Sequence, residues 1–154
     1  MTFAERLADP GWRLTALLFL GMILSMAALR LAESARLRRK FSRARVVRTS
    51  YLVTFYGLES QPAAAAFRSL GAVVLLKDGL YFRARVGGFE LSIPAPAILN
   101  IGLTNTHRGR TLRQYVVAIR FRTSEGQGET AAFRFAQPGW WLTALRDTLL
   151  PGRA

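Results

Sequence analysis

Very few residues in this sequence are of the types that perform catalysis or bind metal ions. The chain has one histidine, His107, and no cysteine. A zinc site needs three or four ligands, and a histidine-activated nucleophile needs serine and carboxylate partners. His107 stands near the turn-forming residues Asn105 and Gly109, so we expect it to be an exposed loop residue. The sequence therefore predicts a protein that is not an enzyme and that uses no metal ion or cofactor.

The carboxylates do not form a catalytic pattern either. Asp78 precedes a glycine, and Asp-Gly is the strongest signal for a type I′ hairpin turn. Glu125 and Glu129 flank the glycine-rich stretch 126–128, which we expect to be a turn, so a working acid–base pair is not expected there. That stretch also lacks the strand and helix that surround a nucleotide-binding glycine motif. We find no candidate active site in the sequence.

Arginine is the residue type with the most potential for recognition. Lysine and arginine total 22 against nine acidic residues, which gives a formal charge of +13. Alternate residues of a strand point to the same side, so Arg83 and Arg85 could bind one phosphate-rich group together. A solvated sheet face shows the same alternation. Further members of this candidate basic face are Arg120, Arg122 and Arg134.

A second basic group lies in the polar stretch 104–113, which we expect to be a loop. Loops on the surface of a domain often carry the residues that bind a partner. The candidate partner-binding residues of this loop are Arg108, Arg110 and Arg113.

A third basic group follows the most apolar part of the chain, residues 14–29, which carry no charge. A membrane-spanning helix needs about 20 mostly apolar residues. That length is reached if Arg13 and Arg30 extend their charged ends to the two interfaces and Trp12 lies among the headgroups. We call the basic residues behind this segment the collar: Arg36, Arg38, Arg39, Lys40, Arg43, Arg45 and Arg48.

These flanks predict a single-pass membrane anchor. Positive charge after an apolar segment keeps that side in the cytoplasm, so we expect the N-terminus outside and the C-terminal domain inside the cell membrane. A cleaved signal peptide, with Ala32 and Ala35 as its small residues, and a buried helix are the alternatives. The collar can act as a topology signal, as a contact for anionic headgroups worth about 1 kcal/mol per residue, or as both. The adjoining anchor argues against a nucleic-acid-binding arm.

The remaining residues alternate between apolar and polar types as β-strands do. From residue 46 a strand runs to Gly57, and residues 61–68 suit a short helix or a covered connection. Residues 71–93 predict a three-stranded meander with turns at Asp78-Gly79 and Gly87-Gly88. Further strands are expected at residues 97–103, 115–122 and 130–136.

A helix is expected from Pro138 to about Leu149, because Trp141, Leu145 and Leu149 recur every fourth residue. The order is six or seven antiparallel strands followed by one amphipathic helix. Such a helix can close the open end of a strongly bent sheet. The predicted class is mainly β, an α+β barrel or sandwich behind an N-terminal apolar helix.

This order resembles the pleckstrin-homology-like (PH-like) fold, in particular its bacterial and GRAM-like branch. The residues that carry the resemblance are the hairpin 71–82, the segment 91–101 and the closing helix with Trp140 and Trp141. The resemblance implies a binding or scaffolding domain. In phosphoinositide-binding members a lysine precedes an Arg-x-Arg pair, and Lys77 with Arg83 and Arg85 is similar to that pattern.

We therefore expect four regions: a short tail (1–11), a transmembrane helix (12–32), a basic juxtamembrane linker (33–48) and a PH-like domain (49–150). The favoured function is a membrane-anchored module that recruits or stabilises a protein partner or membrane complex. The alternatives are a domain that senses anionic lipids and an accessory subunit whose anchor packs against other membrane helices.

Overall fold

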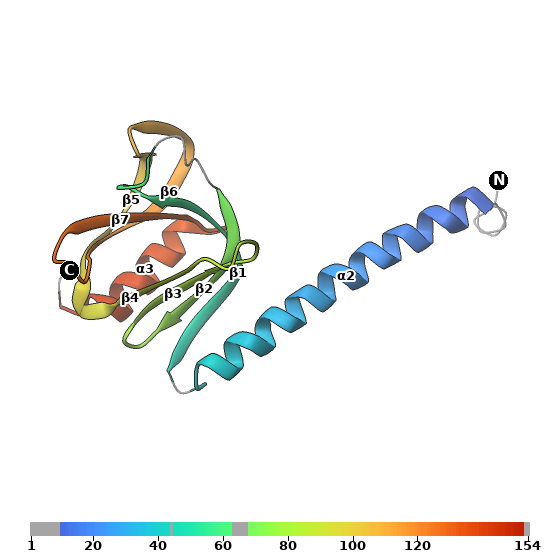
Figure 1. Cartoon of the computed structure of the whole chain (residues 1–154), viewed down its shortest axis with the longest axis horizontal. Coiled ribbons are helices and arrows are strands. Elements are labelled where there is room, and N and C mark those ends of the chain that lie inside the picture. The colour runs from blue at the N-terminus through green and yellow to red at the C-terminus, as the bar shows by residue number, and fades with distance from the viewer. Residues whose placement is uncertain (1–9, 44, 63–67, 153–154) are drawn as a thin grey trace. The chain divides into compact units, whose positions relative to one another are not determined.

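The computed structural model describes residues 10–43, 45–62 and 68–152. The chain forms two compact units, Met1–Ser42 and Arg43–Ala154. Among the described residues, the first unit consists mainly of one helix, α2 (Pro10–Lys40), and the second contains a β-sheet and a second helix (Figure 1). The expected short helix at residues 61–68 falls largely on residues 63–67, which lie outside the described residues.

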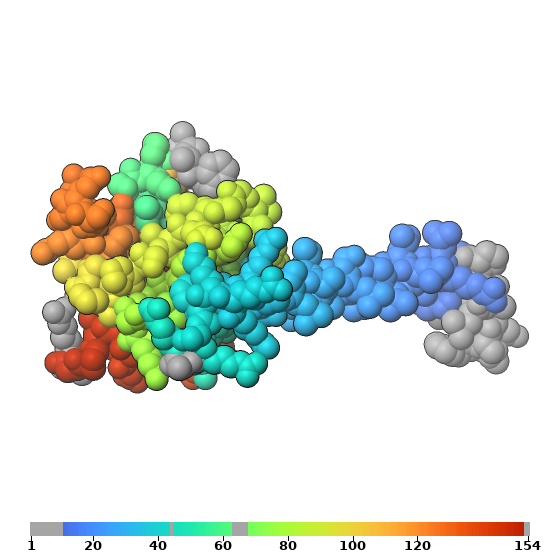
Figure 2. Space-filling view, turned by 60° about the horizontal axis from the view of Figure 1, so that its bottom comes forward, coloured from blue at the N-terminus to red at the C-terminus, as the bar shows by residue number. Residues whose placement is uncertain are grey.

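Helix α2 has 31 residues, and the segment Gly11–Lys40 is long and apolar enough to cross a membrane, with a mean hydropathy of 2.0 over its most apolar window. Its large apolar side chains from Trp12 to Leu31 are exposed, whereas Leu37 near its C-terminal end is buried. Figure 2 shows one face of this helix. The Ser25 hydroxyl donates to the Gly21 carbonyl oxygen at 2.8 Å, which satisfies the hydroxyl inside the apolar run. A membrane anchor and a signal sequence both meet this description. The helix includes the expected spanning segment 12–32 and continues into the expected linker.

Seven strands form one antiparallel sheet in the order β4-β3-β2-β1-β7-β6-β5. The strand count and the order along the chain agree with the expectation of six or seven strands followed by a helix. The strands are β1 (Val46–Leu58), β2 (Ser69–Leu76), β3 (Gly79–Ala84), β4 (Glu90–Pro94), β5 (Ile98–His107), β6 (Arg110–Arg122) and β7 (Gly128–Arg134). A short 3-10 helix, η1 (Ala95–Ala97), joins β4 to β5.

Helix α3 (Pro138–Leu149) lies in the concave side of the bent sheet (Figure 1). The predicted apolar stripe is confirmed, since Trp141, Leu145 and Leu149 are all buried. The Trp141 ring stacks on Phe135 with a centroid distance of 4.5 Å. Burial of these large side chains fixes the helix against the sheet, because each contributes about 1.5–3 kcal/mol through removal of apolar surface from water.

The centre of the core is a group of phenylalanines from three strands. Phe55 of β1, Phe82 of β3 and Phe133 of β7 lie with their ring centroids 5.0–5.5 Å apart. All three are at most 2% exposed. Every second residue of a strand points to the same face. The alternation in the sequence therefore predicted the side of the strand on which each of these rings lies.

Two predicted turns need correction. The β5–β6 connection is not a loop over residues 104–113 but a tight hairpin whose two turn residues are Arg108 and Gly109, with φ of 54° and 69°. In the β2–β3 hairpin, Leu76 pairs with Gly79, so the turn residues are Lys77 and Asp78, and neither Asp78 nor Gly79 has positive φ. The expected type I′ turn at Asp78-Gly79 is therefore wrong.

Gly79 is required for a different reason. A Cβ atom at this position would lie 2.6 Å from the carbonyl oxygen of Ile93 on the neighbouring strand β4. Glycine is needed here because the backbones of β3 and β4 approach closely, and not because the residue has a positive φ. The predicted three-stranded meander itself is present as β2, β3 and β4.

Candidate binding groove

The sheet has an apolar groove near the end of β1, the start of β2 and the β3–β4 loop. We call it the β1–β3 groove, and its volume is about 610 Å³. That volume is within the usual range for a ligand pocket, roughly 300–1,000 Å³. The surface of the groove is mostly apolar, although some of the lining residues are polar or charged. They are Phe55, Gly57, Gln61, Arg68, Ser69, Leu70, Ala84, Arg85, Val86, Gly87 and Phe89.

Two stacked aromatic rings line the groove. Phe89 lies over Phe55 with a centroid distance of 5.5 Å and an angle of 13° between the ring planes. Phe55 is buried, whereas Phe89 is 36% exposed. Leu70 and Val86 beside them are exposed to 42% and 84%. These exposed apolar side chains give the groove a surface that could be covered by an apolar group of a partner.

The local sequence explains how Phe89 reaches this position. Gly87 and Gly88 have φ of 81° and 67°, values that glycine adopts without the strain of a side chain. They reverse the chain, and the Ala84 amide then donates to the Phe89 carbonyl oxygen at 2.8 Å. The predicted Gly87-Gly88 turn is thus confirmed, and its consequence is that Phe89 returns onto Phe55.

Two arginines lie among the residues that line the groove. The guanidinium carbon of Arg68 is 5.3 Å from the centroid of the Tyr56 ring. Arg85 donates from Nη2 to the carbonyl oxygen of Tyr51 at 3.1 Å. Both side chains carry a positive charge. The groove therefore combines an apolar surface with positive charge.

A polar network holds the wall that contains Gly57 and Gln61. His107 is 6% exposed, which contradicts its expected place in an exposed loop. Its Nε2 lies 3.0 Å from the Gly57 carbonyl oxygen, and its Nδ1 lies 3.0 Å from the Glu59 carboxylate. A carbonyl oxygen only accepts, so Nε2 carries a proton and donates it. His107 thus attaches the end of β1 to the β5–β6 hairpin.

Arg108 extends this network from the hairpin turn. Its Nε and Nη2 donate to the Gln61 carbonyl oxygen at 3.1 and 2.8 Å, and Nη2 also donates to the Pro62 carbonyl oxygen. The Gln61 side chain in turn accepts from the Leu58 amide at 3.1 Å. Arg108 therefore binds within its own chain. The other two residues of the expected partner loop, Arg110 and Arg113, lie on β6 and are exposed.

A buried carboxylate completes the attachment of the segment after β1. Glu129 on β7 is 7% exposed and accepts hydrogen bonds from the Ser60 amide at 3.2 Å and from the Ser60 hydroxyl. It also accepts from the Thr130 amide at 2.8 Å. Glu129 therefore holds Ser60, and Glu125 lies apart from it in the exposed β6–β7 turn.

The structure places the expected basic face on separate parts of the sheet. Lys77 lies in the β2–β3 turn, close to the first residue of β3, Gly79. Arg83 lies four residues further along β3, opposite Ala72. Four residues of a strand span about 13 Å, so Arg83 is about that far from the start of β3. Arg83 also forms an ion pair with Glu90 at 3.2 Å. The lysine and the Arg-x-Arg pair are therefore at different ends of the hairpin.

The remaining arginines of that face are also spread out. Arg120 of β6 lies opposite Thr130, and Arg122 lies opposite Gly128 at the end of the same ladder. Arg134 lies opposite Thr54 of β1, four residues from Thr130 along β7. All three are exposed. Anion binding by these residues stays a prediction.

Three members of the collar, Arg43, Arg45 and Arg48, belong to the second unit. Arg45 forms an ion pair with Asp78 of the β2–β3 turn. The guanidinium carbon of Arg48 lies 3.3 Å from the centroid of the Trp140 ring. The other members are exposed: Arg36, Arg38, Arg39 and Lys40 lie near the end of α2, and Arg43 follows it.

Sequence reasoning missed the groove because its parts are far apart in the chain. Phe55, Leu70 and Phe89 come together only through the pairing of β1 with β2 and of β2 with β3. A local signal did exist for Phe89, since an aromatic residue directly after two glycines in a turn is free to fold back onto the sheet. No comparable signal marked Arg68.

Comparisons with known proteins identify a fold and no family. No protein-family model matches the chain, and no curated protein matches it. A chain of the 8S snRNP assembly intermediate is similar in structure, with 8% identity, a TM-score of 0.55, and coverage of 71% of this chain and 85% of that one. The C-terminal domain of an unknown protein from Leishmania infantum is also similar, with 14% identity, a TM-score of 0.52, and coverage of 76% of this chain and 97% of that one. At these identities the similarity shows the shared fold alone.

Proposed function

We propose that this chain is a membrane-anchored, non-enzymatic docking module that recruits or stabilises a protein partner at the inner face of the cell membrane. The observation that carries the proposal is the β1–β3 groove, whose apolar surface lies beside the positive charges of Arg68 and Arg85. Such a surface suits a partner segment that presents an apolar side chain and a nearby carboxylate.

The fold supports the proposal. We assign the second unit to the PH-like class on its bent antiparallel sheet of seven strands and its closing C-terminal helix. The two similar structures show that this fold occurs in other proteins, but at 8% and 14% identity they do not indicate a function for this chain. Function must therefore be argued from the groove itself, since one fold can support unrelated activities.

The membrane location rests on α2 and the collar. The segment Gly11–Lys40 has the length and hydropathy of a spanning helix, and basic residues gather at its C-terminal end. By the positive-inside tendency the second unit lies in the cytoplasm. An uncleaved anchor keeps the groove near the membrane, where its partner is then also expected.

A protein partner is favoured over an anionic lipid by the positions of the arginines. Binding of a headgroup by the expected pattern requires Lys77, Arg83 and Arg85 to converge, and the strand register separates Lys77 from the other two. Arg83 is further engaged by Glu90. The groove, in contrast, offers more apolar than charged surface, as the contact region of a protein partner does.

Photo-crosslinking in the full-length chain can test this proposal. A benzophenone amino acid replaces Val86, which is 84% exposed beside the groove, and in a control chain it replaces Tyr115, which is 62% exposed on β6. After irradiation of intact cells, the adducts are separated by mass. We expect a discrete protein adduct at position 86 that is absent at position 115 and is lost when Arg68→Glu and Arg85→Glu are added.

The same experiment separates the alternatives. Adducts at position 86 with the mass of lipids, and none with protein, would replace this proposal with the lipid-sensing function. A protein adduct of equal yield at both positions, unaffected by the charge reversals, would show that the groove does not select a partner. The charge reversal Arg122→Glu outside the groove is the matched control and should leave the adduct at position 86 unchanged.

A further inference from the structure

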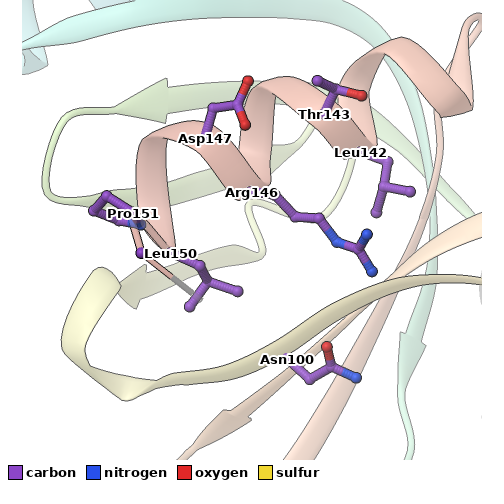
Figure 3. Close-up of a pocket in the computed structure, with 8 residues that line it drawn as sticks. Asn100, Leu142, Thr143, Arg146, Asp147, Leu150 and Pro151 are labelled. Carbon is purple, nitrogen blue, oxygen red and sulfur yellow. The ribbon is translucent and has the colours of Figure 1, made fainter. Parts of the chain in front are cut away.

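The second unit has another groove, between α3 and the edge strand β5. Its volume is about 570 Å³, and Asn100, Arg146 and Asp147 are among its lining residues. Figure 3 shows Leu142 and Arg146 pointing into it, while Asp147 points away. Arg146 donates from Nε to the Ile101 carbonyl oxygen at 2.9 Å, so this group already has a partner within the chain. Charges of both signs line this groove, and it therefore does not select the charge of an occupant.

The β1–β3 groove differs from it in charge. Its two charged lining residues, Arg68 and Arg85, are both positive, and no aspartate or glutamate is among the described residues that line it. Glu90, which follows the lining residue Phe89, forms an ion pair with Arg83 at 3.2 Å. Complementary charge steers the encounter with a partner and excludes partners of the wrong sign. The lining of this groove therefore favours an occupant that carries negative charge.

Contacts within the chain hold both arginines at the groove. The backbone amide of Arg85 donates to the Leu70 carbonyl oxygen at 2.8 Å, which attaches the end of β3 to the start of β2. Arg68 lies over the Tyr56 ring, and the Tyr56 hydroxyl accepts a hydrogen bond from Nε2 of Gln114 at 2.8 Å. A guanidinium can bind a carboxylate through two parallel hydrogen bonds. The two arginines are therefore positioned to receive carboxylates at the groove.

Part of the apolar wall of the groove is aromatic. Phe89 is stacked on Phe55, and its ring centroid lies 6.4 Å from that of Phe82. The hydrogen bond from the Ala84 amide to the Phe89 carbonyl oxygen fixes this position, so the exposed ring is in place without an occupant. An aromatic pair is worth about a two- to tenfold gain in affinity beyond the effect of buried area. Guanidinium groups also stack on aromatic faces, so this groove favours an aromatic over an aliphatic side chain.

We propose that the β1–β3 groove binds a partner segment in which an aromatic residue stands close to glutamate or aspartate. The aromatic ring stacks on Phe89, and the carboxylates pair with Arg68 and Arg85. This inference rests on the proposed function, because it names the chemistry of the segment by which the partner is recruited. A second copy of this chain is disfavoured as the occupant, since each copy carries a formal charge of +13.

Titration of the full chain in detergent micelles with peptides can test this inference. The probe is a capped pentapeptide, Glu-Gly-Tyr-Gly-Glu, and its binding is followed by NMR through the methyl groups of Val86, which lines the groove. In one matched peptide leucine replaces the tyrosine, and in another lysine replaces both glutamates. We expect the tyrosine peptide to bind about two- to tenfold more tightly than the leucine peptide, and the lysine peptide not to bind.

Protein variants separate the contribution of the ring from that of the charges. Phe89→Leu should abolish the preference for tyrosine over leucine, while the preference for glutamate over lysine remains. Arg68→Gln combined with Arg85→Gln should have the opposite effect. Arg122→Gln removes a charge outside the groove and is the matched control, which should leave both preferences unchanged.

Three results would overturn the inference: equal binding of the tyrosine and leucine peptides, equal binding of the glutamate and lysine peptides, or no binding of any peptide. Displacement of the bound peptide by inorganic phosphate at equal concentration would also overturn it and would indicate a phosphate-bearing headgroup as the occupant. If the inference fails while the protein adduct at position 86 persists in cells, the proposed function stands with a partner segment of other chemistry. If the adduct is absent as well, the proposed function fails too.

Discussion

The guanidinium of Arg48 stacks over the ring of Trp140, with 3.3 Å between its central carbon and the ring centroid. Arg48 belongs to β1 and Trp140 to the first turn of α3, so the contact joins the start of the sheet to its closing helix. A residue that the sequence grouped with membrane-facing charges thus contributes to the folded unit. Arg45, another member of the collar, likewise contacts the folded unit through its ion pair with Asp78 of the β2–β3 turn.

The first prediction concerns this contact. Arg48→Gln should lower the free energy of unfolding by about 0.5–1 kcal/mol, the usual value of an exposed cation–π pair. Urea unfolding of the full chain in detergent, followed by tryptophan fluorescence, measures the change. Arg43→Gln, which removes a neighbouring exposed charge, is the control, and an equal effect of both substitutions would contradict the role of the stacking.

The second prediction concerns His107. His107→Phe removes the donor to the Gly57 carbonyl oxygen and should destabilise the fold by about 1–3 kcal/mol, the cost of a buried polar group left without its partner. His107→Gln retains a donor and should cost less. The unfolding midpoints of the two variants test whether His107→Phe is less stable than His107→Gln. If His107 served only to fill space, His107→Phe would be the more stable of the two.

The third prediction concerns the close approach of β3 and β4 at Gly79. Gly79→Ala should destabilise the fold by about 1–3 kcal/mol, because its Cβ would lie 2.6 Å from the Ile93 carbonyl oxygen. Gly102→Ala has open space around it and no positive φ, so its effect should be near zero or slightly stabilising. Similar losses in thermal stability for both variants would argue against the close approach of β3 and β4.

The fourth prediction concerns the closing helix. Leu145 is fully buried, and Leu145→Ala should cost about 2–5 kcal/mol through lost transfer energy and the cavity left behind. Leu142 is only partly buried, so Leu142→Ala should cost clearly less. Chemical denaturation of both variants provides the comparison, and equal costs would mean that α3 packs differently from the structure described here.

The strands and the closing helix could be predicted because their signals are local. Alternation identified the inner positions of Val117, Ile119 and Phe133, and the four-residue spacing of α3 identified its buried side. Each pattern reflects how one element divides its own side chains between core and water. The apolar run of α2 is likewise a property of consecutive residues.

The end of the β5–β6 hairpin around Arg108 could not be predicted in this way. Residues 104–107 and 110–113 are strands, but they lack apolar alternation because polar contacts and solvent take the place of a core on this part of the hairpin. His107 is buried through Gly57 and Glu59, about fifty positions earlier in the chain. A single histidine in a polar stretch therefore suggested exposure.

By itself the sequence determined the kinds of elements and their order, the apolar N-terminal helix and the concentration of basic residues behind it. The tertiary structure alone decided where the arginines lie relative to one another and where two grooves form. Strand register sets those distances, and it depends on contacts between segments far apart in sequence. A residue pattern read along one strand cannot contain that information.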